Sequence, residues 1–70
     1  MPLTMVETGR RVRLVGIDGG RGVRARLADL GVTIGSEIEI ISVGAGPMIV
    51  SVRGGRVAIG RGMAAKMNVA

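Results

Sequence analysis

The chain contains no phenylalanine, tyrosine, tryptophan, cysteine or histidine, and this absence limits what it can fold into. Its core has to be built from Val, Ile, Leu, Met and Ala, which together make up 47% of the residues. With 70 residues, the chain buries only about 60% of the surface that its unfolded form exposes. Disulfides cannot add stability, because cysteine is absent. We therefore expect one small domain over residues 1–70, with an aliphatic core and marginal stability.

The apolar content is high for so short a chain, with a mean hydropathy of +0.46. Two interpretations of this surplus stay open. Some apolar surface remains exposed and marks a docking site or an interface between copies of the chain, which would make the protein a homo-oligomer. Alternatively, the surplus fills a dense core, and single Val and Ile residues are scattered outside it.

No segment predicts a membrane span. Residues 38–50 form the longest apolar run, but charged, polar and glycine residues interrupt it, and a spanning helix needs about 20 apolar residues. The apolar stretch of a secretory signal peptide is also missing, because Arg10, Arg11 and Arg13 occupy its place. We therefore expect a cytoplasmic protein.

Alternating apolar and polar residues predict several short strands. Gly54-Gly55 favours a tight hairpin between the third and fourth of them. The alternation breaks at Ile40-Ile41, which indicates a bulge or burial on both faces. The expected strands span residues 10–17, 37–43, 48–53, 56–59 and 66–69. Five short strands favour a small barrel, whose closure would remove the exposed edges of the sheet.

Residues 21–30 form the one good candidate for a helix. Three apolar residues at positions i, i+4 and i+7 would lie on one face and pack on the core. They are Val23, Leu27 and Leu30. Gly31 occupies the place of a left-handed residue that ends a helix. Asp18 lies where its side chain could cap the start of the helix, or where its negative charge could interact favourably with the positive end of the helix dipole.

Two single helical turns are expected outside this helix. One covers residues 5–8, with Thr4 as its cap and Gly9 at its end. The other covers residues 60–65.

The residues offer almost no catalytic chemistry. Without Cys or His, neither a Cys–His nor a Ser–His pair can form. Zinc and copper sites lack their usual ligands for the same reason. Glu37 and Glu39 lie two residues apart on one strand face, about 7 Å from each other. We interpret them as solvated residues, although a weak site for a hard cation remains open there. The sequence therefore predicts no enzyme, no catalytic residue, no metal site and no cofactor.

The glycine-rich segment 16–22 precedes the expected helix and could cradle a phosphate group on backbone N–H groups. It matches neither of the common nucleotide-binding motifs, and Asp18 within it would repel phosphate. A tight turn between strand and helix explains the glycines without a ligand.

The net charge of +5 permits an acidic partner of several kinds. Arg21, Arg24 and Arg26 cluster on or near the expected helix, where they are candidates for binding a partner. A nucleic-acid-binding module is the alternative, since small barrels often bind nucleic acid. It is the less favoured one, because the chain has no aromatic side chain on which bases could stack.

Three stretches together form a recognisable pattern over nearly the whole chain. They are Ile17-x-Gly19-Gly20 with Arg26-Leu27-x-x-Leu30-Gly31-Val32-x-x-Gly35, residues 46–54 (GPMIVSVRG) and residues 58–69 (AIGRGMAAKMNV). This pattern resembles the FeoA family of ferrous iron transport accessory proteins. The resemblance implies a mostly β fold, an SH3-like small five-stranded barrel with one short α-helix inserted after the first strand.

The resemblance also implies a function. The chain would bind and modulate FeoB, a membrane permease with a GTP-binding domain, and would thereby lie at the inner membrane through its partner. The family's helix motif maps onto Arg26, Leu27, Leu30 and Gly31, and Leu27, Leu30 and Gly31 already have a structural role by their spacing. In this hypothesis Arg21, Arg24 and Arg26 contact the partner, and a solvated helix face is the other interpretation of these arginines. Because His and Cys are missing, the role in ferrous transport would be exerted on the transporter and not on the ion.

Overall fold

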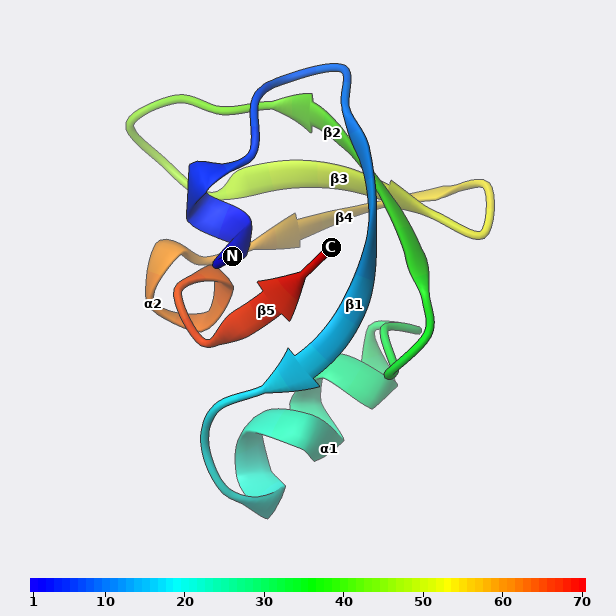
Figure 1. Cartoon of the computed structure of the whole chain (residues 1–70), viewed down its shortest axis with the longest axis vertical. Helices are drawn as coiled ribbons and strands as arrows, with labels where there is room; N and C mark the ends of the chain where they lie inside the picture. The colour runs from blue at the N-terminus through cyan, green and yellow to red at the C-terminus, as the bar shows by residue number, and fades with distance from the viewer.

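The alternating segments form one antiparallel sheet of five strands in the order β4-β3-β2-β1-β5. The computed structural model describes all residues from Met1 to Ala70. Figure 1 shows that the sheet curls into a small barrel, with the longer helix at one end. The strands are β1 (Arg11–Ile17), β2 (Glu37–Ser42), β3 (Met48–Val52), β4 (Gly55–Ile59) and β5 (Met67–Val69). This mostly β architecture, with a short helix after the first strand, confirms the prediction.

Three helical segments accompany the strands, one before β1, one between β1 and β2 and one between β4 and β5. They are η1 (Leu3–Met5), α1 (Arg21–Asp29) and α2 (Arg61–Ala64). The prediction of a turn over residues 5–8 is wrong, because the turn forms at Leu3–Met5, where Leu3 becomes completely buried. Thr4 therefore lies inside the turn instead of capping it. None of the helices has the length and apolar character that crossing a bilayer requires.

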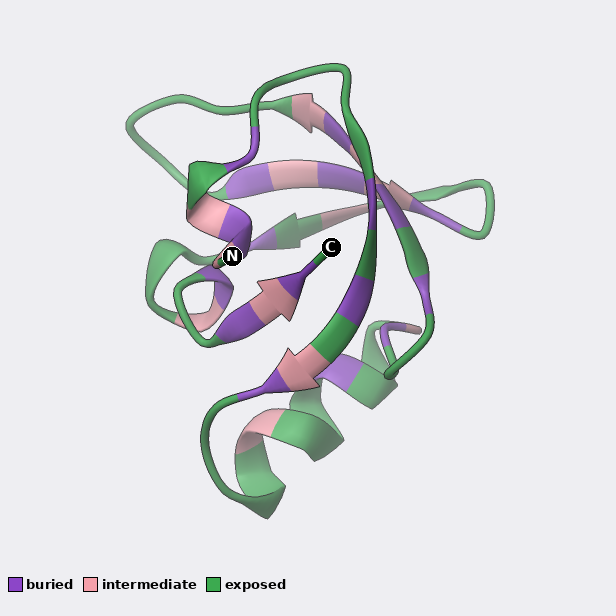
Figure 2. Cartoon of the chain, in the orientation of Figure 1, coloured by how far each residue is buried: buried purple, intermediate pink, exposed green.

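The core lies inside the curled sheet, because every second side chain of a strand points to the same face. On β3, for example, Met48, Val50 and Val52 are buried and the residues between them are half-buried. Figure 2 shows this alternation of burial along the strands. The buried apolar side chains form a single cluster of 16 residues. An aliphatic core without aromatic rings therefore holds the barrel together.

The predicted irregularity in the second strand is confirmed. The register between β2 and β3 shifts between Ile40 and Ser42, so one residue of β2 has no partner. A bulge of this kind bends a strand and increases its twist. The bend helps a sheet with such short strands to curl around its core.

The two edges of the sheet differ. The outer edge of β5 is covered by the first residues, since the Val69 N–H donates to the Met1 carbonyl oxygen at 2.8 Å and Pro2 bridges to Asn68. β4 pairs with β3 alone. The expectation that closure removes every edge is therefore wrong for β4. The three residues of β5 pair with β1 on one side and with the N-terminal segment on the other. β5 therefore has no unpaired side with which β4 could form hydrogen bonds, and the sheet stays open along β4.

The hairpin between β3 and β4 is present, but its turn lies one residue earlier than Gly54-Gly55. Val52 pairs with Gly55, so Arg53 and Gly54 are the two residues of the turn. Both have positive φ, 52° and 80°, which is the conformation of a type I′ turn. Arg53 is the one non-glycine residue of the chain with positive φ.

Replacing Arg53 by asparagine should stabilise the protein. Asparagine adopts the left-handed conformation more readily than arginine, so we expect a gain of up to about 1 kcal/mol in the free energy of unfolding. Urea unfolding measures it, with a higher midpoint at unchanged slope as the expected result. Gly54→Ala serves as the opposite control and should destabilise. An unchanged midpoint for Arg53→Asn would show that the turn carries no strain.

The ends of α1 confirm one prediction and correct two. Gly31 has a φ of +84° and ends the helix as expected. The helix begins after Gly20, and no side chain caps it, so the proposed capping role of Asp18 is wrong. Gly19 and Gly20 separate Asp18 from the first helical turn. Leu30 is 41% exposed and does not join the core, contrary to the prediction from its spacing.

Candidate functional site

Helix α1 stands outside the barrel and offers most of its surface to solvent. Only Leu27 is completely buried, and Val23 packs partly against the core. In Figure 2 the helix is mostly coloured as exposed. Leu27, with a smaller contribution from Val23, therefore attaches the helix, and most of its remaining surface is free to meet a partner.

The three arginines predicted as partner contacts are all exposed on α1. Arg21 and Arg24 are three residues apart, and side chains at this spacing are neighbours on a helix. Arg26 lies about 160° around the helix axis from Arg24, at 3.6 residues per turn. The structure thus brings Arg21 and Arg24 together and places Arg26 on another side.

A small apolar pocket lies beside Arg24. It has a volume of about 220 Å³, and four of its six lining residues are hydrophobic. They are Ile17, Arg24, Ala28, Val32, Thr33 and Ile34. The Arg24 Nη2 atom donates to the Ile17 carbonyl oxygen at 3.4 Å, which holds the guanidinium group beside the pocket. Pockets for small molecules usually measure about 300–1,000 Å³, so this one is sized for a single apolar side chain.

The turn that forms one wall of the pocket is well fixed. Ser36, the one buried polar residue, accepts a hydrogen bond on Oγ from the Thr33 N–H at 2.9 Å. The Gly35 N–H donates to the Leu14 carbonyl oxygen of β1 at 2.8 Å. These bonds hold Ile34, which is 51% exposed, at the surface in a defined position. An apolar side chain held out in this way suits contact with another protein.

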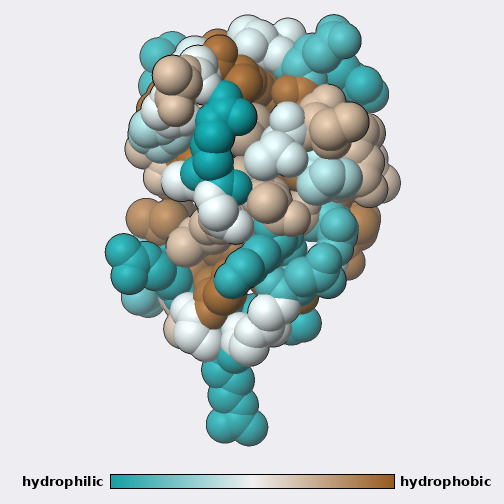
Figure 3. Space-filling view, turned by 90° about the vertical axis from the view of Figure 1, so that its left-hand side faces the viewer, coloured by the Kyte–Doolittle hydropathy of each residue, from teal (hydrophilic) through white to brown (hydrophobic).

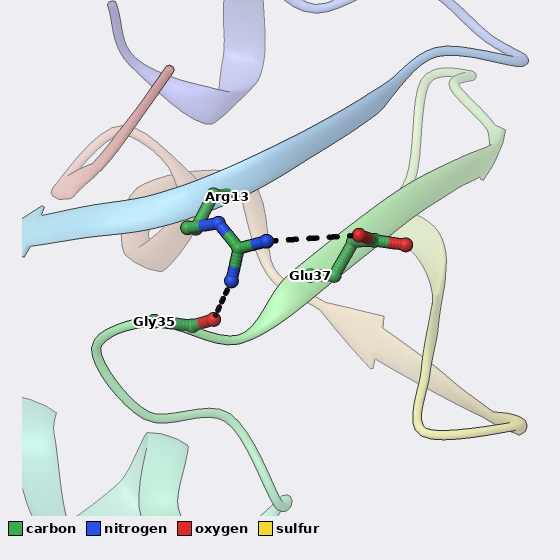
Figure 4. Close-up of polar contacts among 3 residues, drawn as sticks. All are labelled: Arg13, Gly35 and Glu37. Carbon is green, nitrogen blue, oxygen red and sulfur yellow. Dashed lines mark hydrogen bonds and ion pairs between the residues drawn. The ribbon is translucent and has the colours of Figure 1, made fainter.

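The outer face of the sheet carries a second, polar depression of about 340 Å³ without any hydrophobic lining residue. Two ion pairs between β1 and β2 lie in or beside it. Arg11 Nε lies 3.6 Å from Glu39 Oε1, and Arg13 Nη2 lies 3.8 Å from Glu37 Oε2. Figure 4 shows Arg13 between Glu37 and Gly35, whose carbonyl oxygen accepts a hydrogen bond from it at 2.7 Å.

These ion pairs help to decide whether Glu37 and Glu39 form the weak hard-cation site that the sequence left open. Each carboxylate has an arginine as its neighbour, and the chain holds no group of three or more Asp, Glu, His or Cys side chains that could surround an ion. A cation bound there would have to displace an arginine from each carboxylate. The geometry favours two cross-strand ion pairs over a metal site.

Charged and apolar side chains are mixed on the surface. On the face in Figure 3, hydrophobic surface forms narrow areas between hydrophilic side chains and no broad patch. Arginines extend from α1 (Arg21) and from the β3–β4 turn (Arg53), which belong to different parts of the fold. Arg21, Arg24 and Arg26 share α1, but Arg26 faces another side of the helix, so they form no single basic face that could track a nucleic-acid backbone.

The comparison with known proteins decides the family. The FeoA domain family matches residues 1–70. The chain belongs to the FeoA family. A protein of Methanocaldococcus jannaschii named "Putative Fe(2+) transport protein A" is 41% identical over 68 residues, which are 97% of this chain and 83% of that protein. The members of this family are small accessory proteins of ferrous iron transport and not enzymes.

Solved FeoA structures share the whole fold. An iron uptake regulatory protein, FeoA, has a TM-score of 0.93 at 37% identity, covering 100% of this chain and 93% of that one. The Stenotrophomonas maltophilia FeoA complexed with zinc, described as a prokaryotic SH3 domain protein, has a TM-score of 0.82 at 21% identity. It covers 100% of this chain and 89% of that chain. The predicted SH3-like barrel is thereby confirmed.

Sequence reasoning missed the apolar pocket of this FeoA domain. Its lining residues come from the end of β1, from α1 and from the turn after it, so no local pattern joins them. One signal was visible, an isoleucine at position 34 in a polar turn. Sequence reasoning also missed Arg61, which donates to the carbonyl oxygens of Gly44 and Gly46 and holds the loop before β3.

Proposed function

We propose that this FeoA domain, residues 1–70, binds the cytoplasmic side of an FeoB-type ferrous iron permease and modulates it. The observation that carries the proposal is the exposed helix α1 with an apolar pocket at its side and Arg24 at the pocket. Membership of a family of ferrous transport accessory proteins supports the choice of partner. In this proposal the protein is cytoplasmic and reaches the inner membrane through its partner.

The action falls on the transporter and not on the iron. The chain has neither His nor Cys, and the acidic residues of the outer face are engaged with arginines. Ferrous ions prefer sites that combine His with carboxylate. A regulator without such ligands acts through contact with the protein that moves the ion.

The contact combines an apolar and a charged part. An apolar side chain of the permease fills the pocket, where complete burial of a leucine-sized group contributes about 1.5–3 kcal/mol. An acidic residue next to it meets Arg24 and its neighbour Arg21. Arg26, on another side of the helix, contributes less. A pocket of 220 Å³ makes a small anchor, which suits a reversible contact.

Ferrous uptake tests this function in cells. A strain that lacks the chain but keeps the permease should take up ferrous iron at a rate several times different from that of the parent strain. A plasmid copy of the chain should restore the parental rate. Permease abundance, measured by immunoblot, is the control. Unchanged uptake at equal permease abundance would contradict the proposal.

A further inference from the structure

Strand β4 presents the one open edge of the sheet. Its neighbour on one side is β3, and no strand lies on the other side. The opposite edge of the sheet is covered by the chain itself, through the bonds of Met1 and Pro2 to β5. An uncovered edge is a template to which another extended segment can add.

The hairpin geometry identifies the backbone groups on this edge. In a two-residue hairpin the closing pair, here Val52 and Gly55, exchanges hydrogen bonds, and bonded and non-bonded pairs then alternate. The N–H and C=O groups of Val57 and Ile59 therefore point toward β3. Those of Arg56 and Ala58 point away from it. The open edge thus offers two donors and two acceptors to an incoming strand.

The β3–β4 hairpin at this edge carries only positive charge, with Arg53 in the turn and Arg56 on β4. Glu39 of β2 lies in the same cross-strand row, across Ser51 from Arg56, but it is already paired with Arg11. All acidic residues of the chain lie before residue 40, and the last of them is Glu39. The segment 40–70 carries Arg53, Arg56, Arg61 and Lys66 with no acidic residue. Arg56 itself is exposed and forms no salt bridge. An acidic strand would find both its backbone and its charges complemented here.

A second copy of the chain fits this edge poorly. Antiparallel pairing of two β4 strands centred on Arg56 or Val57 would bring their Arg56 side chains into opposite or diagonal positions, and like charges on paired strands destabilise the pairing. Charged residues on an edge strand are a common protection against such self-association. We infer that β4 binds an extended acidic peptide segment by strand addition. This inference uses a surface other than α1 and does not rest on the proposed function.

Amide hydrogen exchange tests the inference with the whole chain and a defined probe, an eight-residue peptide of alternating Glu and Val. In the free protein, the Arg56 and Ala58 amides should exchange fast and the Val57 and Ile59 amides slowly. At saturating peptide, the first two should slow by at least about tenfold, because they gain strand hydrogen bonds. Binding without this protection would overturn the inference.

Two charge-reversal variants distinguish strand addition at β4 from a general attraction of the acidic peptide to the positively charged protein. Arg56→Glu should weaken binding by about tenfold or more, which corresponds to about 1.4 kcal/mol. Arg10→Glu, an exposed residue before β1, makes the same change in net charge and should leave the affinity within about twofold. Equal losses in both variants would overturn the inference. Far-UV circular dichroism checks that each variant is folded.

The same assay tests whether binding needs the outward-pointing backbone groups of β4. Ala58→Pro removes an outward N–H without removing a bond to β3, and it should weaken binding while the protein stays folded.

The same assay also tests whether another kind of ligand occupies the edge. The Lys/Val counterpart of the peptide should not bind. If a single-stranded oligonucleotide of equal charge binds as tightly as the peptide, the edge selects charge and not a strand. Sedimentation showing a dimer of the free chain, with Arg56 and Ala58 protected, would assign the edge to a second copy instead.

Discussion

Replacing Leu27 by alanine should lower the free energy of unfolding by about 2–5 kcal/mol, the usual loss for a large buried side chain. Leu27 is completely buried and is the only such residue of α1, so its loss removes the main attachment of the helix. For a domain with a total stability of about 5–15 kcal/mol, a loss of this size threatens folding itself. Urea unfolding should be followed by far-UV circular dichroism, because the chain has no aromatic residue to provide fluorescence.

Leu30→Ala is the matched control for this prediction. It removes the same atoms from the same end of α1, but Leu30 is 41% exposed and lies outside the core cluster. We expect a loss of less than about 1 kcal/mol. Equal losses for the two variants would contradict the assignment of Leu27 as the anchor of the helix.

Reversing the charge of Arg24, with Arg24→Glu, should weaken binding to the permease by at least about tenfold, since a repulsive charge then faces the acidic group of the partner. Arg24 lines the apolar pocket and is tied to the Ile17 carbonyl oxygen. The loss should therefore exceed what net charge alone produces. A binding titration of the purified chain against detergent-solubilised permease measures it.

Arg26→Glu provides the control on the same helix. It makes the same change in net charge and residue type, but its side chain lies on another side of α1. We expect its affinity to stay within about threefold of the wild type, the size of a contribution from an exposed charge. If both variants bind equally poorly, general charge attraction and not the pocket governs the contact.

The strands could be predicted from the sequence because alternation directly reflects a sheet with one buried face. Val12 and Leu14 on β1 are buried, as their spacing predicts, and so are Ile38 and Ile40 on β2. Gly31 could be predicted for a similar reason, since a left-handed residue at the end of a helix favours glycine. These features depend on neighbours within a few positions of the chain.

Leu30 shows where local spacing fails. The helix ends at Asp29, and the chain turns at Gly31 so that the Val32 N–H donates to the Leu27 carbonyl oxygen at 2.8 Å. Val32 is thereby completely buried at the end of the helix, and Leu30 stays outside. Helical periodicity contains no information about a residue that folds back from beyond the helix.

The pocket and the open edge could not be predicted from the sequence, because both depend on which distant segments of the chain meet after folding. The pocket needs Ile17 from β1, Ala28 from α1 and Ile34 from the following turn, which meet only in the folded chain. The open edge depends on β5 pairing with β1 instead of β4, and composition does not specify a strand's partner. The candidate arginines were visible in the sequence, and the predicted helix over residues 21–30 contains all three, so helical periodicity alone separates Arg26 from Arg21 and Arg24.

The titration of the unmodified chain against an FeoB-type permease tests the central claim most directly. The account predicts saturable binding at micromolar concentrations of the chain, and an acidic peptide that occupies only β4 should leave this binding intact. The absence of binding to folded, nucleotide-loaded permease would contradict the claim that this FeoA domain acts on its transporter through α1.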